Sequence, residues 1–341
     1  MRSILFAGLL LASMSLSAQS NTENALEYME EMDDHIEQLK GETWSYLKAA
    51  TRGRSARTME RRREDLIEEL GDVRRDVVEL GSFHGNRSYQ QAVLEYLRIS
   101  DLVMRQDFAR LMDLEEVANQ SYDAMEAYLL ASEIAGNKLD SAFADYADAK
   151  ATFATEYNIR LVEGEMSRRE RRMVAASNAL EYYNDMFLVY FRANVQDIII
   201  IDVMNNGDVL ELEQNISALK EAAQMSMAVL DTFPDFNGDR KLSRKANELM
   251  EFYIELSEEH YPKVVEFYIA KEDFEELHAR IESTRERDLT QEDIDTYNAA
   301  VENYNQMIEV YNTTNEQLND LRSEHYEMWE EAVEDFFDEH S

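Results

Sequence analysis

Residues 24–50 read NALEYMEEMDDHIEQLKGETWSYLKAA, and the spacing of their apolar side chains decides the fold class. These side chains recur every three or four positions, as they do along one face of an amphipathic α-helix. They are Leu26, Met29, Met32, Ile36, Leu39, Trp44 and Leu47. A second helical run, which leads to Leu80, has the same spacing and places Met59, Leu66, Ile67, Leu70, Val73 and Val77 inward. The sequence therefore predicts an all-α fold.

The composition agrees with that prediction. Among 341 residues there are 10 glycines, 2 prolines and no cysteine. Sheets need frequent turn residues, so the scarcity of helix breakers argues against sandwiches, barrels and doubly wound folds. The absence of cysteine excludes disulfides, thiolate metal sites and a lipid-modified cysteine.

The chain is strongly acidic, with 71 acidic and 34 basic side chains and a formal charge of −37. Phosphate binding needs a basic surface, so direct nucleic-acid binding is not expected. With 45% hydrophobic residues, the chain also differs from a disordered acidic tail. An acidic protein with a sizeable apolar core is expected.

The sequence carries an internal similarity. The peptide NALEY at residues 24–28 recurs at residues 178–182, and the FHGNR peptide at 83–87 resembles the segment 233–240. We therefore expect an internal duplication that forms two tandem antiparallel helical bundles, residues 21–168 and 169–341. The alternative is a chance similarity between two acidic helical sequences.

Helix ends are predicted from capping residues. Asn137 with Asp140 is expected to begin a fifth helix after a break at Gly136, and Pro262 is expected to kink a later helix. Further caps are predicted at Asp208 with Glu211, at Ser243, and at Thr290 with Asp293.

The first residues are typical of a secretory signal peptide, residues 1–20. Arg2 supplies a positive charge, residues 4–11 are apolar, and Ala18-Gln19-Ser20 offers small side chains for cleavage before Asn21. A membrane anchor is the alternative, but the apolar run is shorter than the roughly 20 residues that span a bilayer. The expected location is outside the cytoplasm: periplasmic, extracellular or at the cell surface.

Three Tyr-Asn pairs recur at seven-residue spacing. Seven residues are about two helical turns, so the tyrosines share one stripe and the asparagines flank it. The pairs are Tyr297-Asn298, Tyr304-Asn305 and Tyr311-Asn312. One interpretation is a bundle seam; the other is a groove of rings and amides that binds a glycan or an extended peptide.

Residues 235–239 offer the candidate metal ligands Asp235, Asn237 and Asp239. Their alternate spacing matches the first three ligands of a calcium loop. The pattern then departs, because Arg240 and Ala246 stand where such loops need Gly and Glu. The two hypotheses are a surface Ca²⁺ site and an Asx-rich turn that caps a helix.

Motifs for catalysis are absent from the sequence. It has no Gly-x-Ser-x-Gly, no cysteine nucleophile and no glycine-rich phosphate loop. Glu275 and His278 have the Glu-x-x-His spacing of di-iron bundles, but such a site needs a second pair. We therefore predict a protein that is not an enzyme and has no resident cofactor.

Two arginine clusters interrupt the acidic sequence, residues 52–63 and 168–172. One interpretation is pairing with neighbouring carboxylates. The other is a docking patch for an anionic envelope component or for the acidic face of another copy.

The signal peptide, the tandem helical unit and the Tyr-Asn pairs together resemble uncharacterised exported helical surface or periplasmic proteins of Gram-negative bacteria, of the Bacteroidota and spirochaete type. The resemblance implies an envelope location and a non-enzymatic role. It assigns no site residues.

The sequence thus predicts a non-enzymatic binding or scaffolding module of the cell envelope, with a protein or glycan partner. The alternative is a helical bundle that handles a small ligand or a divalent cation.

Overall fold

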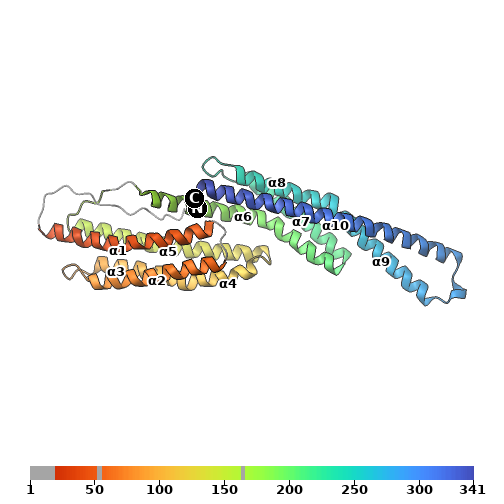
Figure 1. Ribbon diagram of the computed structural model, residues 1–341, viewed down its shortest axis with the longest axis horizontal. Helices are drawn as coiled ribbons and strands as arrows, with labels where there is room; N and C mark the ends of the chain where they lie inside the picture. The colour runs from red at the N-terminus through yellow and green to blue at the C-terminus, as the bar shows by residue number, and fades with distance from the viewer. Residues whose placement is uncertain (1–19, 52–55, 163–165) are drawn as a thin grey trace. The chain divides into compact units, whose positions relative to one another are not determined.

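The computed structural model describes residues 20–51, 56–162 and 166–341, which form α-helices joined by short connections (Figure 1). These residues contain no β-strand, and two isolated β-bridges close tight turns. The all-α prediction is confirmed. The predicted signal peptide lies outside the described residues except for its last residue, Ser20, where the first helix begins. Residues 52–55 of the first arginine cluster also lie outside them.

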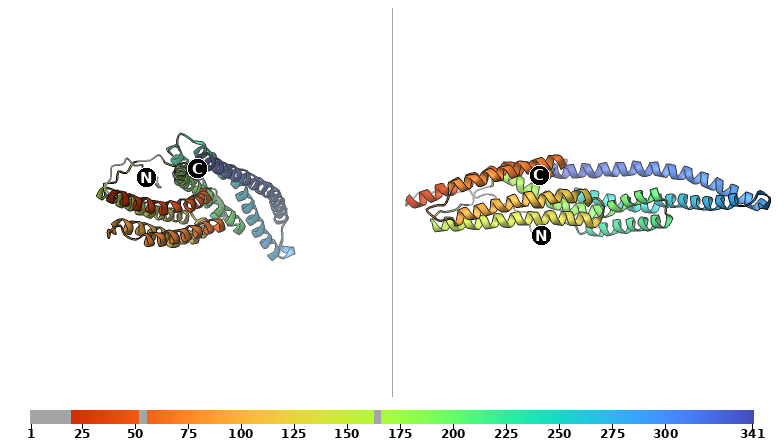
Figure 2. Two further views of the ribbon diagram at one scale, coloured as in Figure 1. Left: turned by 60° about the vertical axis from the view of Figure 1, so that its left-hand side comes forward. Right: turned by 90° about the horizontal axis from the view of Figure 1, so that it is seen from below.

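The chain divides into two compact units (Figures 1 and 2). The first extends to Asp185 and includes Phe337–Ser341, and the second is Met186–Phe336. The first unit contains α1 (Ser20–Thr51), α2 (Ala56–Leu80), α3 (Ser88–Leu102), the π-helical turn η1 (Val103–Asp107), α4 (Phe108–Ala118) and α5 (Tyr122–Glu156). Helix α6 (Arg168–Asn206) begins in this unit and ends in the second.

The remaining elements follow α6 in the second unit. They are α7 (Val209–Leu230), α8 (Lys241–Glu255), the π-helical turn η2 (Leu256–His260), α9 (Tyr261–Ser283), the short 3₁₀ turn η3 (Glu286–Asp288) and α10 (Gln291–His340).

The core of the first unit forms where α1 packs on α2, α2 on α3, and both α3 and α4 on α5. Met29, Met32, Val73 and Val77 are completely buried. The predicted apolar faces of α1 and α2 therefore lie inward, although Trp44 and Met59 remain half-buried. Burying each large apolar side chain contributes about 1.5–3 kcal/mol, so these faces hold the unit together.

The second unit has its own core. Helix α7 packs against α8 and α9, with Leu219 and Met250 completely buried. Trp329 of α10 stacks on Tyr190 of α6, with ring centroids 4.5 Å apart.

Two tight turns of the same kind precede α3 and α8. Phe83 bridges to Asn86, and Phe236 bridges to Asp239. The two central residues have positive φ in each turn: 49° and 87° at His84 and Gly85, and 53° and 86° at Asn237 and Gly238. This conformation is a type I′ turn, which favours Asn and Gly.

Each π-helical turn interrupts a helix 15 residues after the start of α3 or α8. A π turn shifts the backbone hydrogen bonds from i−4 to i−5. In the first unit, the Arg63 guanidinium donates from Nη1 to the Met104 carbonyl at 2.8 Å. Glu60 holds the same guanidinium, at 2.6 Å from its Nη2. In the second unit, the turn ends immediately before α9, whose first turn contains Pro262.

Several predicted caps are confirmed. Thr290 and Asp293 cap α10 reciprocally, with Asp293 N–H donating to Thr290 Oγ1 at 3.2 Å and Thr290 N–H donating to Asp293 Oδ2 at 3.0 Å. Asp208 accepts from the Glu211 N–H at 2.9 Å.

Other predicted boundaries are wrong. Helix α5 runs unbroken through Gly136, so Asn137 caps nothing, and the helix begins after Ser121, which accepts from Ala124 N–H at 3.2 Å. One glycine inside a helix costs only about 1 kcal/mol, and packing along α3 and α4 outweighs that cost. Ser243 does not cap α8 either, because its hydroxyl donates to the Arg240 carbonyl inside the first turn.

A buried ion pair ties α1 to α5 in the first unit. Lys150 Nζ lies 2.6 Å from Asp33 Oδ2, and the Tyr146 and Tyr89 hydroxyls donate to Asp33 Oδ1 at 3.1 and 3.4 Å. Burial raises the pKa of Asp33 above its usual range, although Lys150 and the two hydroxyls act to lower it. Desolvation therefore outweighs the attraction at this carboxylate.

A second buried ion pair ties α6 to α10 in the second unit. Arg322 Nε donates to Asp197 Oδ2 at 2.9 Å, and the Tyr261 hydroxyl donates to Asp197 Oδ1. The side chains of Asp197 and Arg322 are 6% and 16% exposed. Burial acts to lower the pKa of Arg322, but Asp197 and Tyr261 outweigh it, so the pKa rises and the guanidinium stays charged.

Candidate functional site

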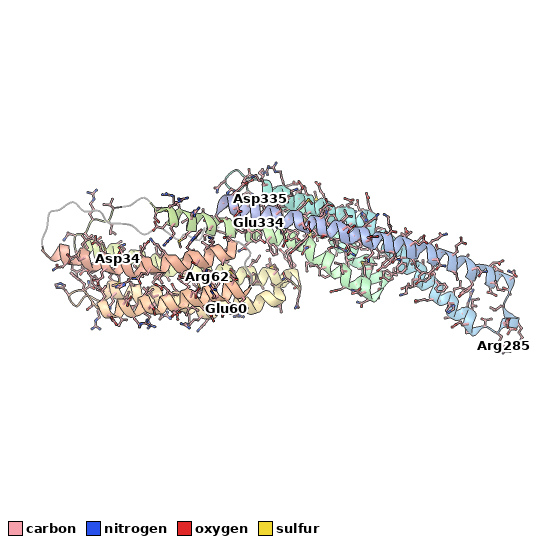
Figure 3. The ribbon with its side chains drawn as sticks, viewed as in Figure 1. Asp34, Glu60, Arg62, Arg285, Glu334 and Asp335 are labelled. Carbon is pink, nitrogen blue, oxygen red and sulfur yellow. The ribbon has the colours of Figure 1, made fainter. Side chains whose placement is uncertain are left out.

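The α9–α10 hairpin is the least buried part of the second unit. No residue from 271 to 313 is buried, and we call this segment the arm. Arg285 lies in the connection between the two helices (Figure 3). A two-helix hairpin buries little of its surface, so most of the arm's side chains are available to solvent.

The three predicted tyrosines lie in the seam of this hairpin. Tyr311 stacks on Phe267 with centroids 4.3 Å apart, and Tyr304 stacks on Phe274 at 5.0 Å. Tyr297 stacks on His278 at 5.8 Å, and its hydroxyl lies 2.9 Å from His278 Nδ1. The rings therefore join α10 to α9 in an antiparallel register.

The three predicted asparagines lie on the outer flank. Asn298, Asn305 and Asn312 are exposed, whereas the tyrosines are half-buried. The structure thus separates the two halves of the motif: the rings stabilise the hairpin, and the amides face solvent as donors and acceptors. Partner binding by these six residues stays a prediction.

Glu275 and His278 do not come together. Glu275 is exposed and lies 3.9 Å from Lys271, whereas His278 Nε2 lies 3.5 Å from Glu282. Glu275 therefore lies on the surface of the hairpin, and His278 lies in its seam.

The predicted cation ligands lie in the tight turn before α8. Asp235 Oδ1 pairs with Arg240 Nε at 2.7 Å, and Asp239 Oδ1 accepts from the Lys241 N–H at 2.8 Å. Asn237 has φ of 53° at the turn apex. These roles match the turn-and-cap hypothesis for Asp235, Asn237 and Asp239, and the calcium hypothesis stays untested.

The arginine clusters differ in their contacts. In the first, Arg63 clamps the π turn η1, and Arg62 lies 3.4 Å from Asp65. In the second, Arg168, Arg169, Arg171 and Arg172 are exposed at the start of α6. Between them, Glu170 is buried and accepts from Lys40 Nζ at 2.6 Å. Burial acts to raise the pKa of Glu170, but Lys40 and Ser167 outweigh it and lower the pKa to about 2.

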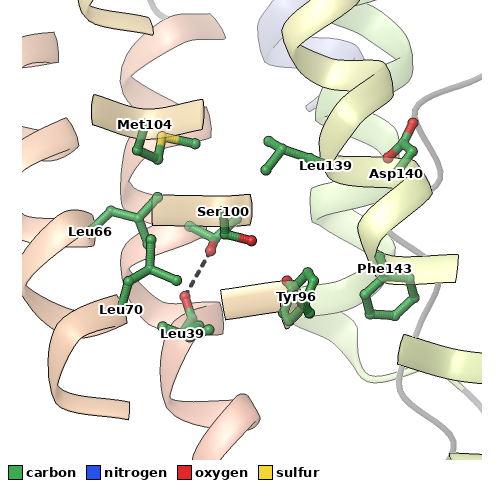
Figure 4. A pocket seen from close by; sticks show the side chains of 10 residues that line it. Leu39, Leu66, Leu70, Tyr96, Ser100, Met104, Leu139, Asp140 and Phe143 are labelled. Carbon is green, nitrogen blue, oxygen red and sulfur yellow. Dashed lines mark hydrogen bonds between the residues drawn. The ribbon is translucent and has the colours of Figure 1, made fainter. Parts of the chain in front are cut away.

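Sequence reasoning missed a cavity in the first unit. It has a volume of about 40 Å³, is partly open to solvent, and lies among α1, α2, α3, η1 and α5 (Figure 4). Its apolar wall is formed by Leu39, Leu66, Leu70, Met104, Leu139 and Phe143. Ten residues from five elements meet here, so no local sequence pattern could have indicated it.

Polar groups also line this cavity. Ser100 is 6% exposed, and its hydroxyl makes no hydrogen bond of normal geometry within the described residues. Burial raises the pKa of Tyr96 to about 12, and the nearby Ser100 hydroxyl acts to lower it. Asp140 is half-buried, and burial followed by repulsion from Glu181 raises its pKa to about 6.

The raised pKa of Asp140 predicts a stabilising substitution. Its folded pKa of about 6 exceeds the unfolded value of about 3.9. The charged carboxylate therefore destabilises the fold fully above pH 6, and the penalty disappears as pH falls below the unfolded pKa. Asp140→Asn should raise the free energy of unfolding by about 1 kcal/mol at pH 7.5, after allowance for partial exposure, and by little at pH 3.5. Urea unfolding of the variant and the unchanged protein at both pH values measures this difference in the free energy of unfolding.

The control for this prediction is Asp145→Asn, which changes an exposed carboxylate of the same helix. Surface changes of this kind shift stability by about 0.5 kcal/mol or less. An equal gain from both variants would show that general charge reduction, and not the environment of Asp140, is responsible.

Comparisons with known proteins give no relative. No protein-family model matches the chain, and searches of curated proteins and of solved structures also found no match. Within the described residues, no helix combines the length and apolar character needed to cross a membrane.

Proposed function

We propose that this protein is a non-enzymatic binding or scaffolding module that captures a protein or glycan of the cell envelope through its arm. The observation that carries the proposal is the arm itself: 43 consecutive residues, 271–313, without one buried residue. A helical hairpin that adds little to the core of its own fold leaves its side chains available to a partner.

The chemistry of the arm fits a polar, hydrogen-bonding partner. The seam tyrosines fix the hairpin, and Asn298, Asn305 and Asn312 form a row of exposed amides at seven-residue spacing. A row of this kind pairs with the hydroxyl groups of a glycan or with the backbone of an extended peptide.

We further propose that the two units arose by tandem duplication. Three correspondences support it: the order of elements, the type I′ turns that precede α3 and α8, and the π turns that follow these helices. The starts of α2, α3, η1 and α4 lie 153 positions before the starts of α7, α8, η2 and α9, as at Ser88 and Lys241 or at Val103 and Leu256.

The proposed location is outside the cytoplasm, in the periplasm or at the cell surface. The signal-peptide pattern of residues 1–20 is the support for export. Fusing the full chain to alkaline phosphatase, which folds only after export, tests it. We expect phosphatase activity from the fusion and none when the fusion also carries Leu9→Arg and Leu10→Arg. A lack of phosphatase activity in both fusions would contradict export.

Site-specific photo-crosslinking tests the arm. A photoreactive amino acid placed singly at Asn298, Asn305 and Asn312 in the full chain should give one adduct of common mass in cells. Matched controls are Gln91 on α3 and Gln224 on α7, which are exposed amides on other helices. Adducts from the controls alone, or from none of the arm positions, would overturn the proposal.

A further inference from the structure

The cavity of the first unit has the build of a binding site. Its lining comes from five elements and surrounds about 40 Å³, the space of about three water-sized spheres. It therefore accommodates a few methylene groups of a chain whose end reaches the opening. A small, flexible, mostly linear molecule fits this volume better than a ring system does.

The hydroxyl of Ser100 marks the inner end. It lies beside Leu66 and Leu70 in Figure 4 and is 94% buried. The Tyr96 hydroxyl is close enough for Ser100 to act on its pKa, but Ser100 makes no hydrogen bond of normal geometry among the described residues. Leaving a buried hydroxyl unpaired costs free energy, so a ligand with a terminal hydroxyl gains by pairing with it. The adjoining π turn places Met104 in the wall, and π turns are frequent at binding sites.

The opposite side of the cavity is anionic. Asp140 lies across the cavity from Leu66 and Leu70 in Figure 4 and remains partly exposed. Glu181 of α6 lies near enough to repel its charge, and Glu133 similarly opposes Asp185. These like charges destabilise one another, and an ammonium group at Asp140 relieves the repulsion. The net charge of −37 also attracts cations to the surface.

We propose that this cavity binds a short amino alcohol, with the ammonium group at Asp140, the methylene chain against the leucines and the hydroxyl at Ser100. This site is independent of the arm. Each part of the ligand matches one feature of the lining: a carboxylate with no cation beside it among the described residues, an apolar wall, and a buried hydroxyl without a hydrogen bond of normal geometry.

The test uses the full chain and four probes of matched length: 4-aminobutan-1-ol, butylamine, butan-1-ol and 4-hydroxybutyrate. Titration is followed by the NMR shifts of backbone amides in α3, η1 and α5. We expect 4-aminobutan-1-ol to bind at least tenfold more tightly than butan-1-ol, and 4-hydroxybutyrate to bind least.

Substitutions separate the two polar contacts. Asp140→Asn should reduce the affinity for 4-aminobutan-1-ol about tenfold and leave the affinity for butan-1-ol unchanged. Ser100→Ala should make the affinity for 4-aminobutan-1-ol equal to that for butylamine. Asp145→Asn, on the exposed side of α5, should change neither. Ser100 makes no hydrogen bond of normal geometry among the described residues and Asp140 is partly exposed, so both variants are expected to fold.

Three outcomes would overturn the proposal. They are equal affinity for the amine and the alcohol, no saturable shift at 100 mM of any probe, and binding that survives filling of the cavity by Ser100→Leu. In each case the space would be a packing gap. The crosslinking result at the arm would be unaffected, so the two proposals fail separately.

Discussion

Asp197→Ala is expected to lower the free energy of unfolding of the second unit by about 3–5 kcal/mol. The substitution removes both acceptor oxygens that hold the Arg322 guanidinium and the Tyr261 hydroxyl. Arg322 is only 16% exposed and keeps its charge at all ordinary pH values, so the unpaired cation stays in an apolar environment. The loss should therefore be nearly the same at pH 5 and pH 8.

Urea unfolding monitored by circular dichroism at 222 nm and by tryptophan fluorescence measures this effect. Asp202→Ala is the matched control, because Asp202 is an exposed carboxylate five residues further along α6. The double variant Asp197→Leu with Arg322→Met should recover most of the lost stability, because it leaves no buried charge. A single-variant loss below 1 kcal/mol would mean that water reaches Arg322 and that the pair contributes little.

The helical fold could be predicted because its signals are local. Apolar spacing in α1 and α2 places Met29 and Val73 inward, and the capping pairs at Asp208 and Thr290 fix two helix starts. Both signals depend on residues within one or two turns of each other. Packing elsewhere in the fold does not alter such local signals, so the predicted faces and helix starts agree with the structure.

The wrong boundaries share a different cause. Gly136 weakens a helix by an amount that the burial of α5 along α3 and α4 exceeds, so a local signal for a break was overridden by packing. The π turns η1 and η2 were also missed. One extra residue in a turn shifts the apolar pattern by a single position, which a short helix does not reveal. In the first unit the compensating hydrogen bond comes from Arg63, 41 positions before Met104.

The candidate sites were predictable only in part. Seven-residue spacing identified the Tyr-Asn stripe, but it could not distinguish a groove from a seam because the phenylalanines that cover Tyr304 and Tyr311 come from another helix. The cavity and the two buried ion pairs depend on residues more than 50 positions apart. In a chain with 71 acidic residues, nothing local distinguishes Asp33 or Asp197 from a surface carboxylate.

Lys150→Ala is expected to lower the free energy of unfolding of the first unit by about 3–5 kcal/mol at pH 8. Lys150 Nζ lies 2.6 Å from Asp33 Oδ2, and its side chain is 6% exposed. Without this cation, the buried carboxylate keeps only the Tyr89 and Tyr146 hydroxyls as partners described here. Asp33 differs from Arg322 in one respect: it can take up a proton and become neutral.

That difference gives the prediction a pH dependence. The pKa of Asp33 is already raised in the folded protein by burial, and loss of Lys150 raises it further. A carboxyl whose folded pKa exceeds its unfolded value destabilises the fold above the folded pKa and ceases to do so below the unfolded one. Urea unfolding should therefore show a smaller loss at pH 4.5 than at pH 8.

The control is Lys138→Ala, because Lys138 pairs with Asp107 at 2.7 Å but is 48% exposed. Exposed pairs contribute about 0–1 kcal/mol, so this variant should change stability little at either pH. A pH-independent loss in Lys150→Ala would mean that the lysine's methylene packing, and not its charge, stabilises α5 against α1. Asp33→Asn in the Lys150→Ala background separates these causes, since it restores stability at pH 8 only if the unpaired carboxylate is responsible.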